Sequence, residues 1–95
     1  TFNLTRADEL AAHCIDALLA RSPVLDPAEV DDVVVGIARQ IGEQSGNVGR
    51  HAVALSKLPL SVSAATLSRA CSSGLNAISM AATQIMSGCA DVAIA

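Results

Sequence analysis

The sequence predicts an α/β fold in which helices alternate with the strands of a parallel sheet. Helical and extended segments follow one another along the 95 residues in the order helix, strand, helix, strand, helix, strand, which is typical of this architecture. Segment 33–38 is a run of mainly β-branched residues without polar alternation. Such a run favours a strand buried on both faces, and therefore a parallel sheet. The connections between the strands are expected to be right-handed crossovers.

The first helix is expected to follow a capping box that begins at Thr5 and is completed by Asp8. Behind it, apolar residues recur at helical spacing. They form one stripe of Ala7, Leu10, Ala11, Cys14, Ile15 and Leu18. Because Cys14 lies on this stripe, we expect it in the core, whereas His13 lies on the opposite, solvated face.

The second helix is expected to run from about residue 47 to residue 58, where Pro59 ends it. Before the first strand, Asp26 followed by proline predicts a short helical turn with the aspartate as its cap. His51 borders the apolar stripe of the second helix, so a partly buried packing role is expected for it.

A strand expected at residues 64–69 leads through a short turn into a helix expected at residues 75–87. This helix is apolar on nearly all sides, and its main stripe is Leu75, Ile78, Ala82, Ile85 and Met86. Such a helix is normally buried on all sides. A chain of 95 residues has too few other elements to bury it in this way. Gly88 ends the helix, and residues 91–95 begin a third strand. We therefore expect a piece of a larger fold, cut at both ends.

Composition narrows the function classes. The chain is 52% hydrophobic and 16% charged, with a mean hydropathy of +0.48, which is too apolar for a free-standing domain of this size. A net charge of −3 and a single aromatic residue argue against nucleic-acid binding. Three widely spaced cysteines indicate neither a disulfide framework nor a metal site, and favour a reducing, cytoplasmic compartment. Polar residues interrupt the uncharged segment 70–90, which argues against a membrane span.

Cys71 lies between the second predicted strand and the helix that follows it. A thiol in the first turn of a helix faces unpaired backbone N–H groups and the positive end of the helix dipole, and both favour the thiolate. The small residues after Cys71 allow a sharp turn that would expose the sulfur. Cys71 is therefore a candidate nucleophile. The alternative is a buried structural cysteine, the commoner state of a free thiol.

The segment around Cys71 resembles the acyl-enzyme signature of the thiolases. The resemblance covers residues 67–78, LSRACSSGLNAI, together with Ile85. Segment 32–36 is similar to the second strand of the family, segment 46–52 to the loop and helix before the cysteine strand, and segment 91–95 to a strand that usually leads into a double glycine. Residues 1–95 are thus identified as part of a thiolase N-terminal domain.

The resemblance implies a fold and an activity. The fold would be part of the αβαβα layered sandwich of thiolases, without its first strand and its later elements. Cys71 would attack the thioester of an acyl-CoA and form an acyl-cysteine intermediate, which CoA or an acetyl-CoA carbanion then consumes. Coenzyme A would be a substrate or product, with no permanently bound cofactor. The family also implies a homodimer or homotetramer that acts in lipid and fatty acid metabolism.

The family's other catalytic groups are expected beyond residue 95. These are a histidine in a Gly-His-Pro motif, a second cysteine and an asparagine, together with the CoA-binding loops. The chain by itself is therefore expected to be inactive. His51 stands where the family often has glutamine and does not match the catalytic histidine. Cys89 follows Gly88 at a helix end, where the dipole disfavours a thiolate, so it is interpreted as a small turn residue.

Two alternatives stay open at this point. One is a β-ketoacyl synthase-like or chalcone-synthase-like condensing enzyme, which shares the layered fold and a cysteine at a helix start. Segments 47–50 and 67–69 favour a thiolase over this alternative. The other is an inert truncated product, whose open sheet edges would be prone to aggregation.

Overall fold

In the computed structural model, residues 4–95 form three helices and three strands that alternate along the chain. Two short 3₁₀ turns, Pro27–Glu29 and Gly42–Gln44, lie in the connections. In chain order the elements are α1 (Ala7–Ala20), β1 (Asp32–Gly36), α2 (Val48–Leu55), β2 (Ser63–Leu67), α3 (Ser73–Met86) and β3 (Ala93–Ile94). The predicted order of elements is confirmed.

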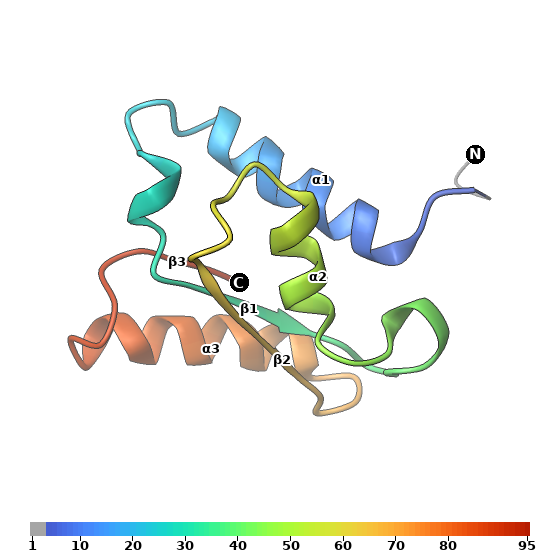
Figure 1. Cartoon of the computed structure of the whole chain (residues 1–95). Coiled ribbons are helices and arrows are strands. Elements are labelled where there is room, and N and C mark those ends of the chain that lie inside the picture. Colours follow the sequence, from blue (N-terminus) through green and yellow to red (C-terminus); the bar gives the residue numbers. More distant parts are fainter. Residues whose placement is uncertain (1–3) are drawn as a thin grey trace.

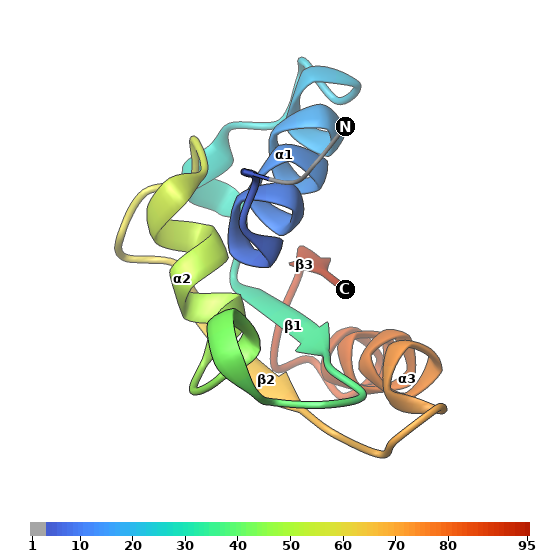
Figure 2. The same cartoon turned by 90° about the vertical axis from the view of Figure 1, so that its right-hand side faces the viewer.

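The strands form one parallel sheet in the order β2-β1-β3. Helices α1 and α2 cover one face and α3 covers the other, so the chain has three layers (Figures 1 and 2). The first crossover leads from β1 through α2 to β2 on one face of the sheet, and the second leads from β2 through α3 to β3 on the other face. Because both the direction and the face are reversed, the two crossovers have the same hand. Val33 and Val34 of β1 are 1% and 0% exposed, which confirms the strand buried on both faces.

The interior is largest between the sheet and the pair α1 and α2. Its buried members are Ile15, Val30, Val33, Ala52, Val53, Leu58 and Val62. The 3₁₀ turn before β1 begins as predicted, because the Asp26 carboxylate accepts the N–H of Ala28 at 3.0 Å. At the other end of the chain, Gly88 ends α3 with a φ of 82°. There the N–H of Cys89 donates to the carbonyl of Gln84 at 2.9 Å, as in a Schellman cap.

The prediction that this chain supplies too little to bury α3 on all sides is confirmed for residues 4–95. The helix packs on β1 through small residues one turn apart, Ser73, Ala77 and Ala81. Their size lets the helix lie close to the sheet and turns the larger apolar side chains outward. The predicted stripe is exposed, with Leu75 at 70% and Met86 at 86%.

The core position predicted for Cys14 is also wrong. On α1 the buried apolar residues are Ala12 and Ile15, whereas Cys14 is exposed together with Leu18. The helix is rotated by about one residue relative to the predicted stripe. His13 is exposed, as predicted.

Two predicted helix ends also differ from the structure. Arg6, rather than Thr5, is the N-cap of α1, and its backbone N–H donates to Glu9 at 3.4 Å. Helix α2 ends at Leu55 instead of residue 58. The cause is the hydroxyl of Ser56, which donates to the carbonyl of Val53 at 2.8 Å and accepts an N–H two residues further on. These bonds replace the helical ones.

The remaining boundaries shift by a few residues. Strand β1 ends at Gly36 rather than 38, and β2 occupies Ser63–Leu67 rather than 64–69. Strand β3 is limited to Ala93–Ile94. Among residues 4–95, no helix is long and apolar enough to cross a membrane, and no group of three or more potential ligand side chains could hold a metal ion.

Candidate active site

Cys71 lies at the carboxyl edge of the parallel sheet, where β1 and β2 end side by side. The last pair in their register is Gly36 with Leu67, and the N–H of Ile37 continues the pairing by donating to the Leu67 carbonyl at 2.9 Å. This edge is where ligands bind in open α/β sheets. Cys71 is exposed there, which excludes the buried structural cysteine within the described residues.

Cys71 lies closer to the start of α3 than the predicted bounds of that helix placed it, yet outside its first turn. Helix α3 begins at Ser73 with Ser72 as its N-cap, so Cys71 lies immediately before the cap and not in the first turn. The helix begins earlier than the predicted residue 75. That the helix dipole activates the Cys71 thiol stays a prediction.

The turn that carries Cys71 is held by a compact set of hydrogen bonds. Ala70 adopts a left-handed conformation with a φ of 50°, which residues with a Cβ rarely do. Its carbonyl accepts the N–H of Ser73 at 3.2 Å, and the carbonyl of Arg69 accepts the N–H of Ser72 at 3.1 Å. The hydroxyl of Ser73 accepts the N–H of Arg69 at 2.7 Å. Cys71 is thus presented on a hydrogen-bonded turn between β2 and α3.

Gly36 allows this turn to approach the sheet closely. A Cβ at Gly36 would lie 2.3 Å from the carbonyl oxygen of Ser73, so only glycine fits this position without displacing the backbone. Sequence reasoning missed both Gly36 and Ser73 as residues that shape the site. The available signals were a glycine at the carboxyl end of a buried strand and a hydroxyl residue two positions after Cys71.

His51 lies on a different part of the molecule. It is exposed on α2, so the partly buried packing role predicted for it is wrong. The hydrogen bond from Arg6 is the main cause that lowers the pKa of Asp8, and the charge of His51 adds a smaller contribution. His51 therefore lies near Asp8 in the first turn of α1. Within residues 4–95, no hydrogen bond joins it to Cys71.

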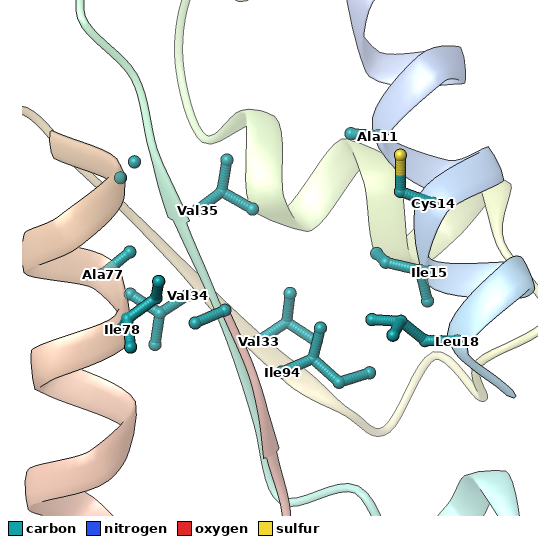
Figure 3. A pocket seen from close by; sticks show the side chains of 13 residues that line it. Ala11, Cys14, Ile15, Leu18, Val33, Val34, Val35, Ala77, Ile78 and Ile94 are labelled. Atoms are coloured by element: carbon teal, nitrogen blue, oxygen red, sulfur yellow. The ribbon is translucent and has the colours of Figure 1, made fainter. Parts of the chain in front are cut away.

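The other two cysteines lie apart from the turn. Cys89 follows Gly88 at the far end of α3 and is exposed. Cys14 lies on α1, across the sheet from α3, at an apolar cavity of about 360 Å³ (Figure 3). This cavity is lined by residues of α1, β1, α3 and β3 and by Ala95, and none of them is charged. Cys71 is not among the residues that line it.

The fold and the site define a three-layer α/β unit with an exposed cysteine at a strand-to-helix turn, an arrangement suited to nucleophilic chemistry. The family model described as "Thiolase, N-terminal domain" matches residues 1–95. The chain belongs to the thiolase family. This confirms the family and the fold class that the sequence predicted.

Curated relatives cover nearly the whole chain. This chain is 49% identical over 90 residues to a 3-oxoadipyl-CoA/3-oxo-5,6-dehydrosuberyl-CoA thiolase of Escherichia coli. The alignment covers 95% of this chain and 22% of the relative. A beta-ketoadipyl-CoA thiolase of Acinetobacter baylyi gives the same identity and coverage. A 3-ketoacyl-CoA thiolase of Colwellia psychrerythraea is 41% identical over 91 residues, with 96% and 24% covered. The chain thus spans less than a quarter of the length of these relatives.

Proposed function

We propose that these residues are part of a thiolase-type acyl-CoA acyltransferase in which Cys71 carries the acyl group. The observation that supports this most directly is the exposed Cys71 on a hydrogen-bonded turn at the carboxyl edge of the sheet, in a chain of the thiolase family. The segment with the acyl-enzyme signature and the exposed turn are the same segment.

In the proposed mechanism, the Cys71 thiolate attacks the carbonyl carbon of an acyl-CoA thioester. The tetrahedral intermediate collapses with cleavage of the bond between that carbon and the sulfur of CoA, and the CoA thiolate leaves and takes up a proton. In this synthetic direction the carbanion of acetyl-CoA then takes the acyl group from Cys71, which forms a carbon–carbon bond and regenerates the Cys71 thiolate. In the degradative direction Cys71 instead attacks the 3-keto carbon of a 3-ketoacyl-CoA, the bond from that carbon to C2 breaks, and acetyl-CoA leaves as a carbanion that takes up a proton. The thiolate of a second CoA then takes the acyl group from Cys71. Covalent catalysis divides one difficult transfer into two easier ones.

The base that deprotonates Cys71 is proposed to come from outside this chain. His51 is exposed on α2, and among residues 4–95 it forms no hydrogen bond with Cys71. The chain would therefore provide the nucleophile and its turn, and would be inactive without further residues. Coenzyme A would act as a substrate or product, with no permanently bound cofactor.

The names of the relatives suggest the substrate class. They are thiolases of 3-ketoacyl-CoA and of 3-oxoadipyl-CoA, so a 3-ketoacyl-CoA is the substrate that we propose. A cytoplasmic homodimer or homotetramer in lipid metabolism is part of the same proposal. The exposed apolar stripe of α3 is compatible with further packing partners in the whole protein.

The test is to incubate the full-length protein with radiolabelled acetyl-CoA and to locate the label by peptide mass spectrometry. We expect acetylation of Cys71 in the wild type and its loss in Cys71→Ser. Cys14→Ser and Cys89→Ser are matched controls, because both cysteines are also exposed and free. Label that persists in Cys71→Ser, or that resides on another residue, would refute the proposal.

The condensing-enzyme alternative makes a different prediction. A β-ketoacyl synthase-like enzyme would take acyl groups from an acyl carrier protein, whereas a thiolase accepts acyl-CoA. The family match favours the thiolase. Turnover with acyl carrier protein substrates and none with acyl-CoA would reverse this preference. The inert-product alternative concerns the 95-residue chain alone, and a cooperative thermal melt of that chain as a monomer would contradict it.

A further inference from the structure

We propose that Ser73 is a positioning residue that holds the Cys71 turn in the geometry required for acyl transfer. This inference rests on the proposed function, because it concerns how the sulfur of Cys71 is presented. Ser73 is the first residue of α3 and only 2% exposed, whereas Cys71, two residues earlier, is exposed. A buried hydroxyl in this place acts on the sulfur through the backbone that joins the two residues.

The hydroxyl of Ser73 contacts three backbone groups around the turn. It accepts the N–H of Arg69 at 2.7 Å and lies 2.7 Å from the carbonyl oxygen of Ala70 and 3.2 Å from that of Ile37. A hydroxyl has one proton, and the shorter distance favours donation to Ala70. One side chain therefore binds both residues that precede Cys71 and also lies against the segment that follows β1.

Ala70 explains why this anchoring is needed. Its φ of 50° places it in the left-handed region, which is unfavourable for a residue with a Cβ and persists only where the surroundings enforce it. Its carbonyl receives both the hydroxyl and the N–H of Ser73, at 2.7 and 3.2 Å. These bonds fix the direction in which the backbone enters Cys71, and with it the position of the sulfur.

The rest of the turn does not depend on the Ser73 hydroxyl. The N–H and hydroxyl of Ser72 donate to the carbonyl of Arg69 at 3.1 and 2.8 Å, and the N–H of Asn76 donates to the carbonyl of Ser72 at 2.9 Å. Helix α3 also packs on β1 through Ala77 and Ala81. Removal of the hydroxyl is therefore expected to loosen Ala70 and Cys71 locally while the helix stays in place.

The experiment compares Ser73→Ala with Ser87→Ala in the full-length protein. Ser87→Ala is matched because it removes a hydroxyl bond to a carbonyl, that of Gln84 at 3.1 Å, at the opposite end of α3. We expect kcat of Ser73→Ala to fall roughly 10- to 100-fold with KM changed by less than about threefold, as for a misplaced reacting group. Alkylation of Cys71 by iodoacetamide should stay within about threefold of wild type, because the sulfur remains exposed. Ser87→Ala should match the wild type.

A second variant tests the role of Ala70. Glycine adopts a positive φ readily, so Ala70→Gly combined with Ser73→Ala should recover part of the lost kcat. A kcat for Ser73→Ala within about threefold of wild type would overturn the inference. So would a loss of Cys71 alkylation as large as the loss of kcat, or the absence of any recovery with Ala70→Gly. Failure of the proposed function looks different, because the wild type itself would then carry no acyl group on Cys71.

Discussion

Gly36→Ala is expected to disturb the Cys71 turn from the neighbouring strand. Gly36 is the last residue of β1, and its backbone passes against the first turn of α3. A methyl group at Gly36 would lie 2.3 Å from the carbonyl oxygen of Ser73 and 2.8 Å from the backbone nitrogen of Gly74. Both neighbours are backbone atoms, so either β1 or the start of α3 must move.

The size of the effect follows from these distances. Ordinary contacts of a Cβ begin at 3.4 Å, so the start of α3 must retreat by about 1 Å. Overpacking costs about 1–3 kcal/mol where side chains can adjust, and we expect about 3 kcal/mol here because the backbone has to shift. The same displacement moves the turn that carries Cys71. A misplacement of about 1 Å can reduce the rate about 100-fold.

The assay is urea unfolding of the full-length protein, together with kcat. Gly74→Ala is the control, because its added methyl group meets no atom within 4 Å. Alanine also has the higher helix propensity, by up to about 1 kcal/mol, so Gly74→Ala should be neutral or stabilising. An unfolding free energy for Gly36→Ala within about 0.5 kcal/mol of wild type would refute the reasoning.

Two further predictions concern side chains whose hydrogen bonds connect the strands to neighbouring segments. Asn47→Ala removes the cap of α2, a 2.6 Å bond from the hydroxyl of Thr66 and a 3.0 Å bond to a carbonyl of β2. It should cost about 2–3 kcal/mol in urea unfolding, and a cost below about 0.5 kcal/mol would contradict this. The backbone N–H groups of Asp91 and Val92 donate to Asp31 and lower the pKa of its carboxyl. Stability from this group is therefore complete above the unfolded value of about 4 and is lost as the pH falls through the lower folded pKa. Asp31→Asn should flatten the acid limb of a plot of melting temperature against pH, and an unchanged limb would count against this role.

Local patterns in the sequence were sufficient for the order of elements and for the candidate nucleophile. The β-branched run of β1 predicted a strand buried on both faces, and Val33 and Val34 are buried. Gly88 predicted the end of α3, because a left-handed residue favours glycine. The resemblance around Cys71 predicted the thiolase family, and the family match confirms it. These features depend on neighbours along the chain, and periodicity or a short motif can report them.

Such patterns could not predict which face of each helix is buried. Helix α1 has two adjacent apolar faces, and only packing against α2 and the sheet buries Ile15 and leaves Cys14 exposed. Helix α3 buries alanines instead of its larger apolar residues, because small side chains allow close approach to β1. Helical spacing gives the angle between the side chains of one helix. Contact with another element decides which of these side chains face the interior.

The sequence by itself determined that this is an α/β chain of the thiolase family with Cys71 between a strand and a helix. Only the tertiary structure showed how that cysteine is held. The hydroxyl of Ser73 lies against the carbonyl of Ile37 in the segment after β1, and Gly36 lets the two backbones meet. These contacts link residues 36 and 37 to residue 73, which lie far apart along the chain. No local pattern records such contacts, because parallel strands bring their carboxyl ends together only when the sheet has formed.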